Sequence, residues 1–221
     1  MSEAASDRTR LHRLPERGHY DRGVINAILD EALICHIGFV HEGAPVVIPT
    51  IHARVGDTLY FHGSPASRML RSLGLEDQVC VNVSLIDGVV VARAAFHNSL
   101  NYRSVVVFGV PRIVDDADEK LAALAAVTNH VIPGRWADSR PMTDKERNGT
   151  LVAALPLTEA SAKVRVGGPK DDDGDYDLPI WAGVIPLTVA AGHPVPDPGM
   201  RANVEVPGYV GDYRRPGTPE V

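Results

Sequence analysis

Apolar side chains change their spacing several times along the first third of the chain, and each spacing predicts a different element. Residues 24–33 place apolar side chains at helical intervals, and Asp21 just before them is a favourable N-cap. From residue 33 onwards the apolar runs become short and are separated by turn signals. This part of the chain predicts one helix and then a β-meander, with strands over residues 33–40, 44–54 and 57–63.

The rest of the chain continues with short strands and one further strong helix. A short helix is expected over residues 66–73, ending at Gly74, which suits the position after a helix C-terminus. The strongest helical pattern covers residues 116–131, where acidic side chains occupy the first turn, as the helix dipole favours. The remaining apolar runs predict strands, with a turn at Asp87-Gly88, over residues 78–86, 89–96, 101–114, 151–158, 161–167 and 178–187.

Together these elements predict a mainly β fold, a small barrel or sandwich of about eight strands with flanking helices. Residues 1–20 are a polar N-terminal extension, and residues 21–190 hold the expected domain. Residues 191–221 contain six of the 17 prolines and show no sustained periodicity. We expect this segment to be a C-terminal arm or tail that is either disordered or lies across a neighbour. The acidic run at 170–177 lacks the terminal Glu of a calcium loop, which favours a solvated loop.

Charge and composition narrow the class of partner. The chain of 221 residues has 22 Lys and Arg against 28 Asp and Glu, a net charge of −6. This balance disfavours a nucleic-acid partner. No apolar run approaches the roughly 20 residues of a membrane span, and the first 20 positions are charged where a signal peptide would be apolar. We therefore expect a cytoplasmic protein without a membrane or nucleic-acid partner.

Residue types that could perform chemistry are present, but their spacing matches no familiar metal or catalytic motif. Cys35 and Cys80 lie in apolar runs and are expected to be reduced and buried. No carboxylate or thiolate recurs at ligand spacing, so no metal site is expected, although histidines gather around the meander at positions 36, 41, 52, 62 and 97. The nucleophile-elbow, P-loop and GxGxxG patterns do not occur at a strand-to-helix turn. Catalytic residues therefore remain unidentified from the motifs.

The segment YFHGSPASR, residues 60–68, is the strongest local signal. Ser64 suits an N-cap and Pro65 the first position of a helix. Free backbone N–H groups there, with the hydroxyl of Ser67 and the guanidinium of Arg68, would suit a phosphate dianion. The alternative is a plain capped helix with a surface arginine.

The order of the motifs resembles that of a known family. The meander, YFHGSPASR, the strand NYRSVVVFGVPRIV, the helix, the tripeptide GRW at 134–136 and the closing WAGVIPL follow one another between residues 15 and 190. This order is similar to that of the pyridoxamine 5′-phosphate oxidase-like flavoproteins, especially the flavin-nucleotide-binding branch related to nitroimidazole-resistance proteins. The resemblance implies a split β-barrel, a homodimer, and FMN bound in a cleft between the two subunits.

The resemblance also implies roles for particular residues. Ser67 and Arg68 match the Ser-Arg pair that grips the FMN phosphate, in agreement with the argument from the helix start. Other matches would line the isoalloxazine (Pro49, Thr50, Ile51 and His52) or lie beside the ribityl chain (Phe61, His62 and Gly63). Such residues would orient the flavin and tune its potential.

Three further positions complete the expected cofactor site. Trp181 matches a Trp that the family places near the flavin, with core packing as the alternative. Arg135 and Trp136 would reach the partner subunit's site. The polar patch at residues 101–103 is typical of this branch and would serve either dimer contacts or phosphate binding.

Departures from the family pattern bear on the reaction. True pyridoxamine phosphate oxidases supply an Arg and then a His after the closing Trp, whereas this chain continues Trp181-Ala182-Gly183-Val184. Only one cation, Arg68, follows the family's Ser, so pyridoxal phosphate synthesis is not expected. We expect an FMN-dependent oxidoreductase acting on a small molecule. The alternatives are a flavin or haem protein without turnover, with haem held by a histidine such as His62, a deazaflavin in place of FMN, or a purely structural barrel.

Overall fold

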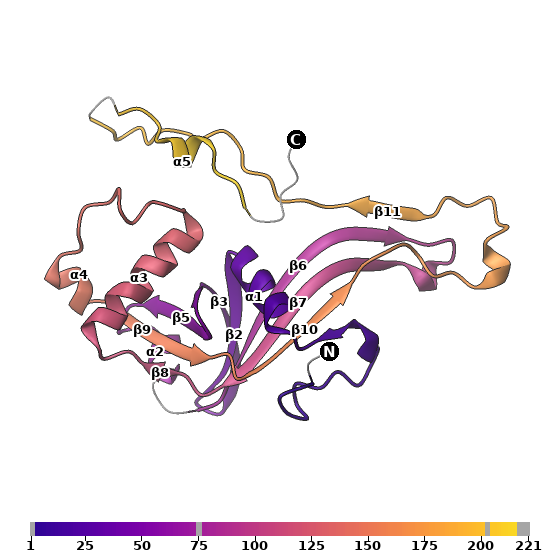
Figure 1. Ribbon diagram of the computed structural model, residues 1–221, viewed down its shortest axis with the longest axis horizontal. Coiled ribbons are helices and arrows are strands. Elements are labelled where there is room, and N and C mark those ends of the chain that lie inside the picture. Colours follow the sequence, from indigo (N-terminus) through magenta and orange to yellow (C-terminus); the bar gives the residue numbers. More distant parts are fainter. Residues whose placement is uncertain (1–2, 74–76, 202–203, 216–221) are drawn as a thin grey trace.

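The structure, a computed structural model, describes residues 3–73, 77–201 and 204–215 (Figure 1). Two antiparallel sheets form its body, and the edge strands of each sheet remain unpaired with one another, so neither sheet closes into a full barrel. The first sheet runs, in spatial order, β1 (Gly18–His19), β10 (Glu159–Arg165), β7 (Ser99–Gly109), β6 (Val79–Val91), β2 (Ile34–His41) and β3 (Ala44–Ile51), with β11 (Gly183–Pro186) also pairing with β6. The second sheet runs β4 (Ala53–Val55), β5 (Thr58–Gly63), β9 (Leu151–Pro156) and β8 (Arg112–Ile113).

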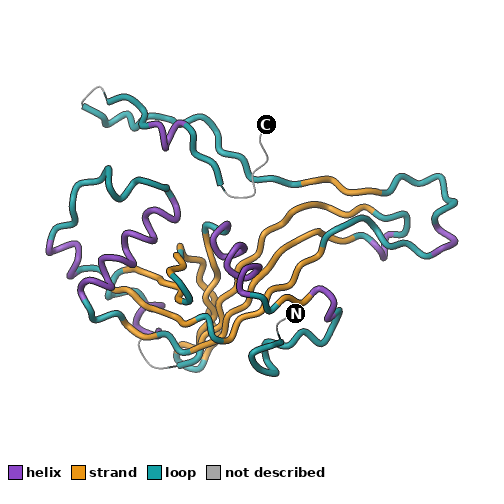
Figure 2. Tube along the Cα trace, viewed as in Figure 1, coloured by secondary structure: helices purple, strands orange, loops and turns teal. Residues whose placement is uncertain are grey.

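The helices flank these sheets, as Figure 2 shows. They are α1 (Arg22–Glu31), α2 (Arg68–Leu73), α3 (Ala117–Val131), α4 (Asp144–Asn148) and α5 (Gly208–Gly211). Short 3-10 turns cover Pro15–Arg17, Ala95–His97 and Asp173–Asp175. Within the described ranges, no helix is long and apolar enough to cross a membrane. The fold is thus mainly β with flanking helices, as the sequence predicts.

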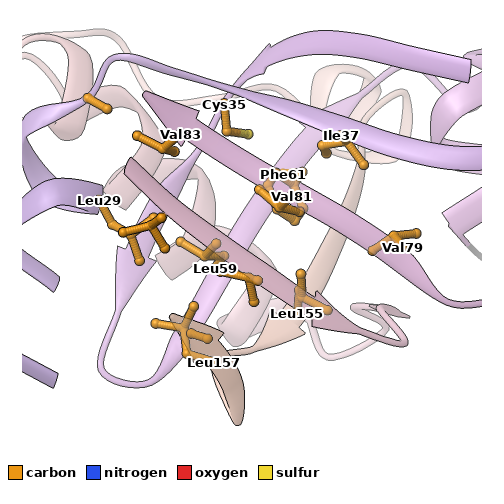
Figure 3. Close-up of a cluster of buried hydrophobic side chains, with 14 of the residues drawn as sticks. Leu29, Cys35, Ile37, Leu59, Phe61, Val79, Val81, Val83, Leu155 and Leu157 are labelled. Atoms are coloured by element: carbon orange, nitrogen blue, oxygen red, sulfur yellow. The ribbon is translucent and has the colours of Figure 1, made fainter. Parts of the chain in front are cut away.

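The main core lies between the two sheets and under α1 (Figure 3). Its side chains come from alternate positions of the strands, which is why Cys35, Ile37 and Phe39 of β2 are buried while their neighbours face outwards. Phe61 and Leu59 of β5 contribute fully buried side chains from the second sheet. Cys35 is unpaired, and burial raises the pKa of its thiol to about 12.

Two of the three predicted helices, α1 and α3, begin at a capping aspartate. The Asp21 carboxylate accepts hydrogen bonds from Gly23 N at 2.8 Å and Val24 N at 3.3 Å, so α1 begins and ends two residues earlier than predicted. The Asp116 carboxylate accepts one from Glu119 N at 2.7 Å at the start of α3. Satisfying these otherwise free amides fixes where each helix begins.

Two predicted strands are each divided. The strand expected over residues 44–54 leaves the first sheet at His52, and the chain enters the second sheet as β4. The strand expected over 101–114 breaks at Val110-Pro111, because proline cannot donate a ladder hydrogen bond, and resumes as β8. Each break carries the chain from one sheet to the other, which is how the barrel is split.

The turn predicted at Asp87-Gly88 is wrong. β6 runs through this dipeptide as one strand, with a register shift against β7 between Ile86 and Gly88. The extra residue makes a β-bulge rather than a hairpin. Gly88 suits this place because a Cβ there would lie 3.0 Å from the carbonyl oxygen of Ile185 on β11.

The bulge marks the base of a projecting arm. β10 pairs with β7 only as far as Tyr102, so the β6–β7 hairpin continues beyond β10 with β11 beside it. We call residues 88–101 and 166–186 the arm, and residues 92–98 and 171–182 the arm tip. Figure 1 shows the arm at one end of the long axis and α4 at the other.

The helix α2 begins later than predicted. Ser64 does not cap it: its hydroxyl accepts a hydrogen bond from Ala66 N at 3.1 Å, and its carbonyl accepts one from Ser67 N at 2.8 Å, which closes a separate turn. Ser67 is the residue before the helix, and its hydroxyl accepts a long hydrogen bond from Leu70 N at 3.5 Å. Gly74, expected to end this helix, lies outside the described residues.

The C-terminal segment returns over its own chain. Tyr213 donates a hydrogen bond to Val131 O at 2.8 Å, at the end of α3. The Arg215 guanidinium donates to His130 O at 2.5 Å and to Glu31 O at 2.6 Å. Residues 204–215 therefore join the C-terminal ends of α1 and α3.

Candidate functional site

A cavity of about 1520 Å³ lies between α3, α4 and the segment that connects them. Four of the residues expected at the cofactor site lie in its wall, although they come from distant parts of the chain: Ile51, His62, Arg135 and Trp136. This volume exceeds that of ordinary small-molecule pockets, so the cavity has room for a large aromatic cofactor.

Helix α3 supplies the apolar wall of the cavity. Leu121, Leu124 and Val127 line it at the spacing of one helical face, followed by Val131 in the last turn. The helix is fixed against β5 at its N-terminal end, where Tyr60 donates a hydrogen bond to Glu119 at 2.8 Å. An apolar wall on a capped helix suits a flat aromatic ligand.

His62 is the titratable side chain that the second sheet contributes to the cavity wall. It comes from β5 and is half-buried, and its Nδ1 is buried with no hydrogen-bond partner in the part of the chain described. Burial lowers the pKa of His62 below its ordinary value. The imidazole is therefore neutral at pH 7, which is the form that can accept a proton or bind a metal.

Cationic side chains surround the cavity on the α4 side. The Arg135 guanidinium donates a hydrogen bond to the Tyr209 hydroxyl at 3.0 Å and forms an ion pair with Asp138 at 3.5 Å. Arg140 forms an ion pair with Glu146 at 2.5 Å. Lys145 also lines the cavity, is exposed, and forms no ion pair within residues 3–73, 77–201 and 204–215. This side of the cavity therefore favours an anionic group.

Helix α4 was not expected from the sequence. Thr143 and Glu146 form a capping box, in which the Glu146 amide donates to Thr143 Oγ1 at 3.3 Å and the Thr143 amide donates to the Glu146 carboxylate at 2.8 Å. The T-x-x-E spacing is a recognised helix start and was the available signal. Without α4 the sequence could not predict this wall of the cavity.

The predicted phosphate pair lies outside the cavity. Arg68 is exposed at the start of α2, and its side chain has no hydrogen bond or ion pair to any described residue. Ser67 is half-buried beside it. Gly63, at the end of β5, packs against Leu70 of the same helix, so the end of β5 and α2 lie together. Arg68 is thus a cation available to a ligand or a partner.

Residues 49–52 separate into exposed and buried positions. Pro49 and Ile51 face outwards on β3, and Thr50 is half-buried. The His52 side chain is fully buried, and its Nε2–H donates to Leu29 O at 2.9 Å. Burial lowers the pKa of His52 to about 4. In this chain the His52 ring thus supports α1 rather than facing a cavity.

The side chains of Phe61 and Trp181 do not line the cavity, for opposite reasons. The Phe61 side chain is fully buried in the core, and only its backbone takes part in the pairing of β5 with β9. Trp181 is 66% exposed in the arm tip, two residues before β11, which rules out core packing within this chain. The structure therefore brings neither side chain to the cavity of its own chain.

The polar patch at residues 101–103 is used inside the chain. Asn101 accepts a hydrogen bond from Arg165 at 2.5 Å and is buried at the base of the arm. Arg103 pairs with Asp87 at 2.7 Å and with Glu31. Two of these three side chains therefore stabilise the arm and its junction with α1. No three His, Cys, Asp or Glu side chains gather as a metal site anywhere in the described ranges.

Comparisons with known proteins agree with this architecture. The family model described as pyridoxamine 5′-phosphate oxidase matches residues 21–164. No curated protein matches the chain. Among solved structures, the flavocytochrome Anf3 from Azotobacter vinelandii is 40% identical, with a TM-score of 0.92, 97% of this chain covered and 100% of that one.

Two further structures extend the comparison. The FAD- and haem-binding protein from Mycobacterium smegmatis is 38% identical, with a TM-score of 0.84, 88% of this chain covered and 95% of that one. A putative 5-nitroimidazole antibiotic resistance protein from Bacteroides thetaiotaomicron is 26% identical, with a TM-score of 0.57, 66% of this chain covered and 86% of that one. The match of the family model and the two relatives above 30% identity show that the chain belongs to the pyridoxamine 5′-phosphate oxidase family.

Proposed function

We propose that this chain is a flavin-binding redox protein that passes electrons to a small-molecule acceptor. The observation that carries the proposal is the cavity beside α3, which gathers Ile51, His62, Arg135 and Trp136 from separate segments behind one apolar wall. A bound flavin supplies the electron chemistry, so the chain's residues need only bind and orient it.

Ser67 and Arg68 are the proposed holders of the flavin phosphate. The support is that the Arg68 guanidinium is exposed with no partner among the described residues, next to a half-buried hydroxyl. Arginine suits this task because its planar fork of donors matches phosphate oxygens. FMN is the flavin that the sequence resemblance implies, whereas the relative from M. smegmatis binds FAD and haem.

The flavin is proposed to lie between two copies of the chain. The outer face of the β2–β3 hairpin carries exposed apolar side chains, among them Ile34, Val40 and Val47 at 49%, 55% and 64% exposure. An apolar sheet face of this kind is typical of a subunit interface. A homodimer would cover it and bring the residues of one copy to the other.

A second candidate is haem in the cavity, with His62 as its ligand. The support is specific: the neutral ring of His62 lines a cavity that has an apolar wall on α3 and carries Arg135, Arg140 and Lys145 on its other side. Such cations would pair with carboxylates on the ligand. Haem would then occupy this cavity, and a flavin bound as well, as in a flavocytochrome, would lie outside it, at Ser67 and Arg68 between the two copies.

The flavin proposal is tested by the absorption spectrum of the purified protein and by chromatography of the extracted cofactor, which separates FMN, FAD and deazaflavin. We expect a flavin spectrum, and Arg68→Ala should weaken flavin binding about 10- to 100-fold. The control is Arg71→Ala, which removes another exposed arginine of the same helix. A colourless protein that cannot be reconstituted with flavin would overturn the proposal.

Turnover and haem are tested separately. Reduction of the bound flavin by a nicotinamide nucleotide, followed by transfer to a quinone or nitro-aromatic acceptor, is expected of an oxidoreductase; its absence indicates storage or sensing. A Soret band that His62→Ala removes supports the haem site. The control is His12→Ala in the exposed N-terminal segment. A Soret band that persists in His62→Ala would exclude His62 as the ligand.

A further inference from the structure

Hydrogen bonds and an ion pair join the two segments of the arm tip, although the tip projects from the body. The Asp171 side chain is fully buried and accepts hydrogen bonds from Arg93 N at 3.0 Å, Ala94 N at 3.3 Å and Arg93 Nη1 at 3.0 Å. Arg93 also lies over the Tyr176 ring at 4.9 Å from its centroid. These contacts fix the two segments of the tip to each other before any partner binds.

The same tip exposes large apolar side chains. Phe96 is 91% exposed and Trp181 is 66% exposed, and Leu178 and Ile180 of the adjoining segment are more than 40% exposed. Single exposed apolar residues are common, but several on one preorganised projection indicate a surface that another molecule covers.

The negative charge of the arm tip indicates which surface of a second copy it would contact. Five aspartates lie within residues 171–177, against the single cation Arg93 of the tip. Asp173, Asp175 and Asp177 form no ion pair within the described residues. At the opposite end of the molecule, the cavity mouth beside α4 carries Arg135, Arg140 and Arg147, each in an ion pair with a neighbouring carboxylate, and Lys145, which has no ion-pair partner among the described residues.

The two surfaces cannot meet within one chain, because they lie at opposite ends of the long axis (Figure 1). A two-fold axis perpendicular to the long axis, located at a face that the two copies share, would bring each tip to the cavity of the other copy. We propose that the arm tip of a second copy of this chain docks at the cavity mouth beside α4 and closes it. This inference rests on the proposed homodimer and adds which surfaces meet.

The lysines of the chain allow a direct test. They are Lys120, Lys145, Lys163 and Lys170, and both Lys145 at the cavity mouth and Lys170 at the edge of the arm tip are exposed. A short amine-reactive cross-linker is applied to an equal mixture of isotope-labelled and unlabelled protein. The expected product is a Lys145–Lys170 link that joins a labelled and an unlabelled chain. A dimer without this link, a link confined to single chains, or a monomer overturns the proposal.

A substitution at the tip gives the second measurement. Phe96→Asp should reduce the inter-chain link and weaken dimerisation by about tenfold or more, because the aromatic ring is the anchor of the contact. The control is Val195→Asp, since Val195 is 90% exposed but lies outside the arm. Equal dimerisation of the two variants contradicts the inference. The cofactor spectrum is recorded alongside: a flavin-containing protein without the link overturns only the docking, and a colourless protein with the link overturns only the proposed function.

Discussion

Arg215 connects two helices that are remote in sequence. Its guanidinium donates hydrogen bonds to Asp30 O at 3.1 Å and Glu31 O at 2.6 Å at the end of α1, and to His130 O at 2.5 Å near the end of α3. The carbonyls at a helix C-terminus have no partners within the helix and carry partial negative charge. A cation at this point therefore satisfies both helices at once, and we predict that Arg215→Ala destabilises the protein.

The size of the effect follows from these three bonds. A hydrogen bond to a charged group contributes about 1.5–3 kcal/mol when it is well shielded. Arg215 is only partly buried, and water can reach the carbonyls once the side chain is removed, so about 1 kcal/mol for each bond is the appropriate scale. The loss should total about 2–3 kcal/mol, or roughly 30- to 150-fold in the folding equilibrium constant.

Urea unfolding followed by circular dichroism measures this loss. The control is Arg214→Ala, which removes the neighbouring exposed arginine, whose side chain has no hydrogen bond or ion pair to a described residue. Arg215→Lys keeps the charge but not the planar fork of donors, so its stability should lie between those of the wild type and Arg215→Ala. If Arg215→Ala and Arg214→Ala unfold at the same urea concentration, the clamp does not stabilise the fold.

Three further predictions concern the scaffold around the site. Because burial lowers the pKa of His52 to about 4, the unfolded chain binds this proton more readily. The free energy of unfolding should keep the full contribution of neutral His52 above about pH 6.5 and fall by about 2 kcal/mol between pH 7 and 5. Urea unfolding of the wild type and of His52→Gln at both pH values measures this, and an equal loss in the two proteins would contradict it. Phe61→Ala should cost about 3–5 kcal/mol in thermal unfolding, without changing flavin content per folded chain. Asp116→Ala should cost about 1 kcal/mol by loss of the α3 cap, whereas Asp115→Ala, beside it and exposed, should leave stability unchanged.

Features set by neighbouring residues were predictable from the sequence. The caps of α1 and α3 each need only a carboxylate two or three residues before the amide that donates to it, so spacing identified Asp21 as a cap, and Asp116, predicted as the first residue of its helix, lies one residue before it. The β2–β3 turn was equally local, because Glu42 and Gly43 both adopt positive φ, at 50° and 77°, as a tight hairpin requires.

Features set by distant pairing were not predictable. Asp-Gly is a strong hairpin signal, yet Asp87-Gly88 continues as a strand because β7 and β11 pair along both its edges. The apolar alternation also runs through His52 without showing that the chain changes sheets there. The arm follows from these pairings, so neither its length nor the exposure of Phe96 could be read from the pattern.

The histidines show why residue type alone could not locate the site. His52 and His62 lie on either side of one β-hairpin, and the resemblance placed both near the flavin. The structure separates them: His52 is fully buried with its Nε2–H bonded to Leu29 O, while His62 lines a cavity; the Nδ1 of each ring is buried without a partner among the described residues. Burial lowers the pKa of both rings, but only His62 has space beside it for a ligand. A neutral buried histidine without an adjacent cavity serves the fold through its hydrogen bond, as His52 does, whereas a neutral ring at a cavity wall has space beside it for a ligand, as His62 does.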